Sequence, residues 1–140
     1  MSKYRLKKDY SSNLIAKWVF DNTYSENGIN AIQGNILNDL SGNNNNGTMY
    51  NLTFVDDIDL GRCGNFNRVD SYVRFNSPII PVGKKSIAIE FKKESYSADS
   101  LVYTRILQNG SAGAGRYQMS IQESVKGIYT QLASSLDAKP

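Results

Sequence analysis

The sequence predicts an all-β protein made of antiparallel strands, and three observations indicate this class. Apolar and polar residues alternate with period two along several short stretches, as they do in a sheet with one buried and one solvated face. Asn-Gly dipeptides and other Gly- or Pro-containing turn signals separate these stretches, and no helical stripe of apolar residues accompanies them. Evenly spaced short strands of this kind are typical of a β-sandwich or a barrel.

The alternation is clearest in three stretches. Residues 14–20 carry an apolar face formed by Leu14, Ala16, Trp18 and Phe20. In residues 71–76, Val73 and Phe75 share one face and Tyr72 and Arg74 share the other, and residues 85–93 place Ile87, Ile89 and Phe91 on one side. Further strands are expected at 48–55, 100–108, 116–122 and 127–133.

Composition describes one soluble domain and excludes several kinds of chemistry. The chain has 140 residues, of which 40% are hydrophobic and 21% are charged, and it contains no internal repeat or linker that would divide it. Its single cysteine, Cys63, allows no intrachain disulfide. The absence of histidine removes the usual general base and the commonest metal ligand.

The charge distribution predicts a short basic arm, residues 1–13, in front of a domain at 14–140. The net charge of +3 is too small to indicate nucleic-acid binding, and much of it lies in the first eight residues. No apolar run approaches the length of a membrane span, and the N-terminus has no apolar signal-peptide core. We therefore expect neither a membrane-spanning segment nor a secretory leader, which leaves the compartment undetermined.

Residues 37–48, LNDLSGNNNNGT, contain four consecutive asparagines between two glycines. Asparagine and glycine both tolerate left-handed backbone conformations, so the stretch predicts a tight loop between strands, with a type I′ turn at Asn46-Gly47. The alternative is an oxygen-rich cation loop, in which side chains of alternate residues bind Ca²⁺. The residues that alternate in this way are Asp39, Ser41, Asn43 and Asn45.

Candidate ligand contacts come from aromatic and arginine residues in the expected strands. Tyrosines on a sheet face stack against sugar rings and offer a polar hydroxyl, although half-buried strand tyrosines without a ligand are also common. Cross-strand charge pairing is the alternative role for the arginines. The candidates are Tyr72, Arg74, Tyr103, Arg105, Tyr117 and Tyr129.

An enzymatic role has weaker support in the sequence. Asp57 and Asp59 are two residues apart and would share a face of a strand, which is the minimum that a two-carboxylate glycoside hydrolase requires. A solvated edge strand explains the same pair without chemistry. No catalytic residue is assigned.

The order of the motifs resembles the laminin-G-like (LamG-like) jelly-roll domains of the concanavalin A-like lectin/glucanase superfamily. Those domains have a W-x-F-D/E strand, a D-x-S-G-N-x-N-x-G-T loop, a glycine-rich element, a D-x-Y-V strand and an alternating strand that ends in E-F/W. The matching residues here are Trp18, Phe20, Asp21, Asp39, Ser41, Gly42, Asn43, Asn45, Gly47, Thr48, Gly61, Gly64, Phe66, Asp70, Tyr72, Val73, Ile87, Ile89, Glu90 and Phe91.

The resemblance implies an antiparallel jelly-roll β-sandwich of the concanavalin A-like kind. It extends from about Leu14 to Lys93 and weakens from Ser100 to Ala133, and the family's later strands, with their W-H-x-V-A element, are absent. We therefore expect the sandwich to be incomplete in this chain or completed by another chain, with assembly into a homo-oligomer or larger particle that covers the open edges.

The resemblance also implies a function and a metal. Members commonly recognise glycans or cell-surface partners, so we expect a noncatalytic, lectin-like module that binds a glycan or cell-surface polymer. The alternative is a structural or assembly protein of a phage particle or surface layer, and a glycoside hydrolase ranks third. No cofactor is required, but a structural Ca²⁺ is implied, with Asp21, Asp39 and Asn43 as its candidate ligands.

Overall fold

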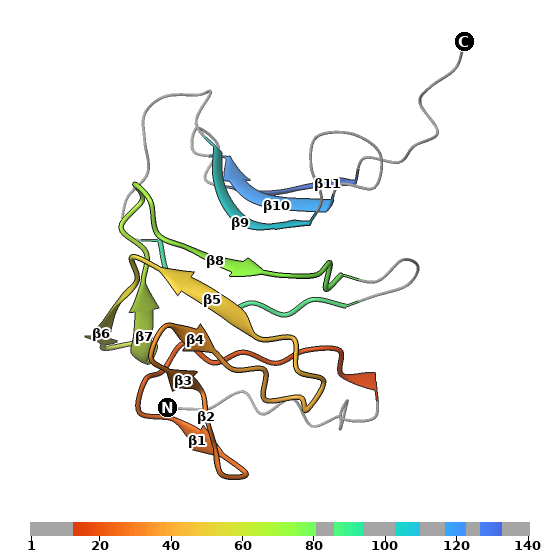
Figure 1. Cartoon of the computed structure of the whole chain (residues 1–140). Helices are drawn as coiled ribbons and strands as arrows, with labels where there is room; N and C mark the ends of the chain where they lie inside the picture. The colour runs from red at the N-terminus through yellow and green to blue at the C-terminus, as the bar shows by residue number, and fades with distance from the viewer. Residues whose placement is uncertain (1–12, 81–85, 94–102, 110–116, 123–126, 133–140) are drawn as a thin grey trace. The chain divides into compact units, whose positions relative to one another are not determined.

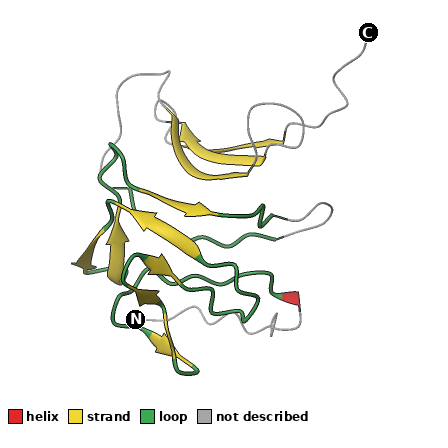
Figure 2. Ribbon diagram, viewed as in Figure 1, coloured by secondary structure: helices red, strands yellow, loops and turns green. Residues whose placement is uncertain are grey.

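The computed structural model describes residues 13–80, 86–93, 103–109, 117–122 and 127–132 (Figure 1). Within these residues, eleven strands form antiparallel sheets, and the only helical residue is Asn13, in a 3₁₀ conformation (Figure 2). The predicted all-β, antiparallel class is therefore confirmed. The chain divides into two compact units, residues 1–79 and 80–140. Each is described by itself below, and the single domain expected at 14–140 stays a prediction.

Two small hairpins open the first unit. Strands β1 (Ser25–Glu26) and β2 (Ile29–Asn30) pair across Asn27-Gly28, whose φ angles of 51° and 77° are those of a type I′ turn. Strands β3 (Ile32–Gln33) and β4 (Ile36–Leu37) form the second hairpin. Ala31, between the two hairpins, and Leu37, in β4, are fully buried and contribute to the core.

The principal sheet of this unit has the strand order β3-β4-β5-β8. Strand β5 (Gly47–Tyr50) lies between β4 and β8 (Tyr72–Phe75), and the register pairs Met49 with Val73 and Tyr50 with Tyr72. Met49 is 7% exposed, whereas Tyr50 and Tyr72 are 38% and 48% exposed. The alternation predicted for residues 71–76 is thus confirmed, and the sheet has one buried and one exposed face, as a sandwich requires.

A longer hairpin joins β6 (Thr53–Asp57) to β7 (Gly61–Asn65). At its turn, the Asp57 carboxylate accepts hydrogen bonds from the backbone N–H groups of Asp59 (2.8 Å) and Leu60 (3.1 Å). Gly61 follows with a φ of 75°, a conformation that favours glycine.

The second unit contains one three-stranded sheet with the order β11-β10-β9. The strands are β9 (Tyr103–Asn109), β10 (Tyr117–Gln122) and β11 (Gly127–Leu132), and a bulge in β9 shifts the register between Met119 and Ser120. In the central strand, Ser120 is fully buried and Ile121 is 4% exposed. Strands expected at 100–108, 116–122 and 127–133 are confirmed for the residues that the structure describes, and residues 100–102, 116 and 133 lie outside them.

Three strand predictions are wrong. Residues 14–20 and the described residues 86–93 belong to no strand, and residues 48–55 form two strands instead of one. The break occurs at Asn51, whose φ of 52° turns the chain out of the extended conformation. Ile89 and Phe91 remain 41% and 40% exposed, so the alternation at 86–93 does not mark a buried sheet face.

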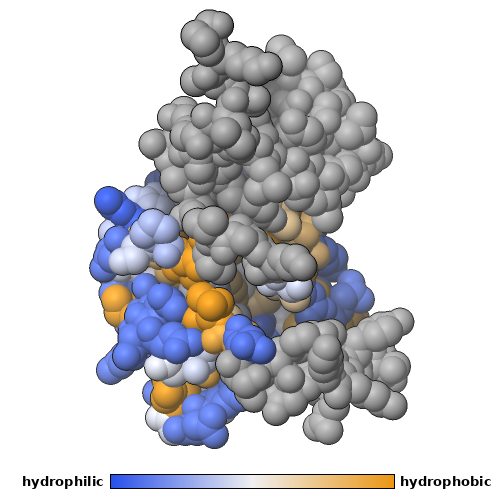
Figure 3. Space-filling view, turned by 90° about the vertical axis from the view of Figure 1, so that its right-hand side faces the viewer, coloured by the Kyte–Doolittle hydropathy of each residue, from blue (hydrophilic) through white to orange (hydrophobic). Residues whose placement is uncertain are grey.

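The surface of the first unit mixes polar residues with small apolar patches (Figure 3). The most exposed large apolar side chains are Ile58 and Val69, each 88% exposed and each in a turn or loop. No helix in the described part of the chain is long and apolar enough to cross a membrane.

We predict that Gly47→Ala destabilises the first unit. A Cβ at position 47 would lie 2.6 Å from Val73 Cγ1 and 2.7 Å from Phe75 Cε1, closer than packed carbon atoms approach. Overpacking of this kind costs about 1–3 kcal/mol of unfolding free energy, which urea denaturation measures. Thr48→Ala, on the other face of the same strand, is the control, and equal effects of the two substitutions would contradict the packing argument.

Candidate functional site

The loop at residues 39–46, here called the asparagine loop, is built around the buried carboxylate of Asp39. Asp39 is 4% exposed. Its Oδ1 accepts hydrogen bonds from the backbone N–H groups of Lys17 and Ser41, both at 2.9 Å, and its Oδ2 accepts one from the Asn45 N–H at 3.0 Å. One carboxylate therefore connects both ends of the loop, at Ser41 and Asn45, to the earlier segment at Lys17.

These hydrogen bonds also set the ionisation of Asp39. Burial raises the pKa of the carboxyl group, but the donors from Lys17, Ser41 and Asn45 favour the charged form more strongly, and the pKa is lowered overall. Asp39 is therefore ionised at neutral pH, and its charge is compensated by backbone dipoles.

The asparagine loop forms hydrogen bonds with the backbone carbonyl groups of residues 14–17, as a neighbouring strand would do in a sheet. The Nδ2 groups of Asn43 and Asn45 donate to the Ile15 carbonyl oxygen at 3.1 and 2.8 Å, and Asn43 Nδ2 also lies 2.8 Å from the Leu14 carbonyl oxygen. The Leu40 N–H donates to the Lys17 carbonyl at 2.8 Å. Residues 14–20 thus satisfy backbone groups without forming a strand, which is why the strand prediction there is wrong.

Trp18 connects this loop to the principal sheet. Its indole Nε1 donates to the Asn45 carbonyl oxygen at 2.9 Å, and its ring lies 4.6 Å from the ring of Phe75, measured between centroids. Trp18 is therefore a structural residue of the first unit.

The type I′ turn predicted at Asn46-Gly47 is wrong. Gly47 is already the first residue of β5, and the left-handed residues of the loop are Gly42 and Asn44, with φ angles of 87° and 59°. Asn46 instead accepts a hydrogen bond from the Asp39 N–H on its Oδ1, at 2.8 Å. Gly47 is required by the close approach of Val73 and Phe75, a packing constraint that the dipeptide itself does not reveal.

The three residues proposed as calcium ligands have separate hydrogen-bonding roles. Asp21 Oδ1 accepts from the N–H (2.8 Å) and hydroxyl (2.7 Å) of Thr23, and this side-chain hydrogen bond is the main reason that the pKa of Asp21 is lowered. Asp39 is bound to backbone amides, and Asn43 turns its Nδ2, a donor, toward carbonyl groups. No cluster of three or more acidic, cysteine or histidine residues occurs among the described residues. With these hydrogen bonds, the three side chains do not fit the ligand set of one shared Ca²⁺ ion. Calcium binding itself stays a prediction.

Two of the predicted ligand residues, Tyr72 and Arg74, lie on the exposed face of the β3-β4-β5-β8 sheet, which we call the outer face. Tyr72 stacks on Tyr50 of β5, with ring centroids 4.6 Å apart and an interplanar angle of 16°. Arg74 is exposed and is paired in register with Thr48. The sequence identified Tyr72 but not Tyr50, because their pairing depends on the strand register.

The other predicted ligand residues lie in the second unit. In register, Arg105, Ser120 and Tyr129 form one row across the three strands, and Tyr103 lies two residues along β9 from Arg105. Tyr117 differs from Ser120 by an odd number of positions and so belongs to the other face. The side chains of Tyr103, Tyr117 and Tyr129 lie outside the described part of the structure.

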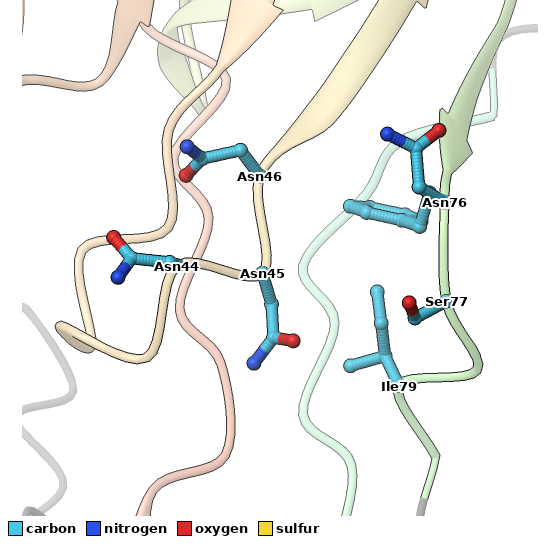
Figure 4. A pocket seen from close by; sticks show the side chains of 7 residues that line it. Asn44, Asn45, Asn46, Asn76, Ser77 and Ile79 are labelled. Carbon is cyan, nitrogen blue, oxygen red and sulfur yellow. The ribbon is translucent and has the colours of Figure 1, made fainter.

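A shallow depression of about 260 Å³ lies beside the asparagine loop, and the sequence did not predict it (Figure 4). We call it the asparagine depression. One wall is the asparagine loop and the other is the chain that leaves β8. Its lining residues are Asn44, Asn45, Asn46, Phe75, Asn76, Ser77 and Ile79. The run of asparagines indicated one wall of the depression. The other wall, from residues 75–79, could not be predicted, because its position beside the loop depends on the tertiary fold.

Comparison with known proteins finds a relative with no assigned activity. An uncharacterized protein of Clostridium acetobutylicum is 47% identical to the chain over 109 residues, which cover 77% of this chain and 26% of that protein. The chain thus spans about a quarter of the length of this curated relative. No family model and no solved structure matches the chain.

We predict that Asp39→Asn lowers the unfolding free energy at neutral pH by about 2–3 kcal/mol, because three backbone donors lose a charged acceptor. Since the pKa of Asp39 is lowered in the folded state, its stabilising contribution is present above the unfolded value of about 3.9 and is lost as pH falls through the folded value.

Urea denaturation of the native and Asp39→Asn proteins between neutral pH and strongly acidic pH measures this contribution. The two proteins should converge in stability at the acidic end. A stability difference that does not change with pH would contradict the assignment. Asp59→Asn, an exposed carboxylate in the β6–β7 turn, is the control.

Proposed function

We propose that the chain is a noncatalytic recognition module that binds glycans or glycan-bearing cell-surface polymers through its outer face. The observation that carries the proposal is the stacked and exposed Tyr50–Tyr72 pair. Stacking fixes both rings side by side, so little side-chain entropy is lost when a sugar ring packs against them. Their hydroxyl groups offer polar contacts at the edge of the same surface.

Polar neighbours of this pair support the same chemistry. Arg74 lies two residues from Tyr72 on the same face of β8, and Thr48 is opposite it on β5. A guanidinium group donates several hydrogen bonds in a fixed geometry and suits hydroxyl, carboxylate or phosphate groups of a cell-surface polymer. The outer face therefore combines an aromatic platform with adjacent donors.

The acidic residues considered for hydrolysis have a structural role that favours the noncatalytic proposal. Asp57 Oδ1 accepts two backbone hydrogen bonds within the β6–β7 turn, and Asp59 is a residue of that turn. A nucleophile and acid must both face the scissile bond, which the turn geometry does not favour for this pair.

Assembly into a larger particle is the second candidate function. Residues 86–91 favour it, because their apolar side chains Ile89 and Phe91 are 41% and 40% exposed and these residues form no strand in the described part of the chain. Such a segment is suited to pair with another chain. Light scattering after size-exclusion chromatography tests this function, and a stable monomer would count against it.

We predict that Tyr72→Ala weakens binding to the best ligand found on a glycan array or in a cell-wall polysaccharide pull-down by about tenfold, because a stacked ring is worth about 1 kcal/mol beyond its buried area. Tyr72→Phe should retain most of the affinity, since it keeps the ring and removes only the hydroxyl.

Ile58→Ala is the matched control, because Ile58 is a large exposed apolar residue in the β6–β7 turn and not on the outer face. It should bind as the native protein does. Blank results from both the array and the pull-down with the native protein would refute glycan recognition, and equal losses in the Tyr72 and Ile58 variants would refute the outer face as its site.

A further inference from the structure

The lining of the asparagine depression has a distinct chemistry. Its polar lining residues are four asparagines and one serine, its apolar lining residues are Phe75 and Ile79, and none of the lining residues carries an ionisable side chain. Its volume of about 260 Å³ would hold roughly eight water molecules at about 30 Å³ each, which is close to the space that one sugar ring occupies.

Asn45 is held in position before any ligand arrives. Its Nδ2 donates to the Ile15 carbonyl at 2.8 Å, and its backbone carbonyl accepts from Trp18 Nε1 at 2.9 Å. The amide plane is therefore fixed, and Oδ1 is turned toward Ser77 and Ile79, as Figure 4 shows. The structure gives this oxygen no hydrogen-bond donor among the described residues, so a half-buried acceptor is available to a ligand.

Ser77 offers a hydroxyl group across from Asn45, and Asn76 lies farther along the same wall, at the height of Asn46 (Figure 4). Both are exposed, and their side chains make no hydrogen bond with the described part of the protein. In contrast, the side chains of Asn44 and Asn46 point to the other side of the loop. The depression thus presents a fixed amide oxygen, a hydroxyl and a second amide beside the apolar wall of Phe75 and Ile79.

We propose that the asparagine depression is a binding site for one uncharged sugar unit, a neutral hexose or N-acetylhexosamine. Amide and hydroxyl groups both donate to and accept from sugar hydroxyls, and the apolar wall accommodates a C–H face of the ring or an acetamido methyl group. A carboxylate or ammonium group finds no opposite charge in this lining, so charged sugars are disfavoured.

This site is independent of the outer face. Phe75 and Tyr72 are three residues apart on β8 and so lie on opposite sides of the sheet. A single sugar ring therefore does not contact both, and either site is able to exist without the other. The proposal adds a second site to the module and does not depend on the function proposed for Tyr50 and Tyr72.

Nitrogen–proton NMR spectra of the full chain, titrated with N-acetylglucosamine and glucose, test the proposal. The backbone amide signals of residues 44–46 and 75–79 should shift and saturate in the millimolar range, as expected for one small group. Glucuronate and glucosamine are the charged comparators and should bind about tenfold more weakly. Equal binding of the charged sugars would overturn the assignment of an uncharged ligand.

Paired variants locate the site. Asn76→Ala combined with Ser77→Ala should weaken binding of the neutral sugar at least tenfold, with an otherwise unchanged spectrum because both residues are exposed. Asn35→Ala should leave binding unchanged, since Asn35 is an exposed asparagine in the β3–β4 turn and does not line the depression. If the double variant fails to fold, Ser77→Ala alone replaces it.

The results also separate this site from the outer face. Shifts confined to Tyr50, Tyr72 and Arg74 would overturn the present proposal while supporting the function proposed for the outer face. Shifts at residues 44–46 and 75–79 that persist in Tyr72→Ala would support it independently. No shift at residues 44–46 and 75–79 with either neutral sugar would overturn it.

Discussion

The buried carboxylate of Asp39 is the interaction on which the first unit depends. A buried charge is tolerated only when hydrogen bonds replace water, and here the backbone amides of Lys17, Ser41 and Asn45 do so. Those amides belong to two segments more than twenty residues apart in sequence. The carboxylate therefore fixes the asparagine loop and holds residues 14–18 against it at the same time.

Several features of the candidate sites follow from this arrangement. With residues 14–18 in place, Trp18 packs on Phe75 and donates to the Asn45 carbonyl, and the Ile15 carbonyl orients the amide of Asn45. Phe75 and Asn45 then become walls of the asparagine depression. The same register of β5 against β8, which pairs Gly47 with Phe75, brings Tyr50 over Tyr72 on the other side of the sheet.

The sequence predicted what depends on local pattern and missed what depends on tertiary contacts. The sequence pattern located β8 and the three strands of the second unit, and one of the Asn-Gly turn signals, Asn27-Gly28, is a turn in the structure. Residues 14–20 have the same alternation but bond to side chains of a distant loop, which no local pattern indicates. Tyr72 and Arg74 were identified from composition and strand position, whereas Tyr50 and the asparagine depression require the register between strands. The LamG-like resemblance itself remains an expectation.

Native-state hydrogen exchange of the backbone amides of Lys17, Ser41 and Asn45 tests the central claim most directly, because these three N–H groups bind the Asp39 carboxylate. The account predicts that all three are protected at neutral pH to nearly the extent of Met49 in the core of β5, although they lie outside regular strands. Exchange at the rate of unstructured peptides would contradict it, since the loop would then not hold residues 14–18 in place.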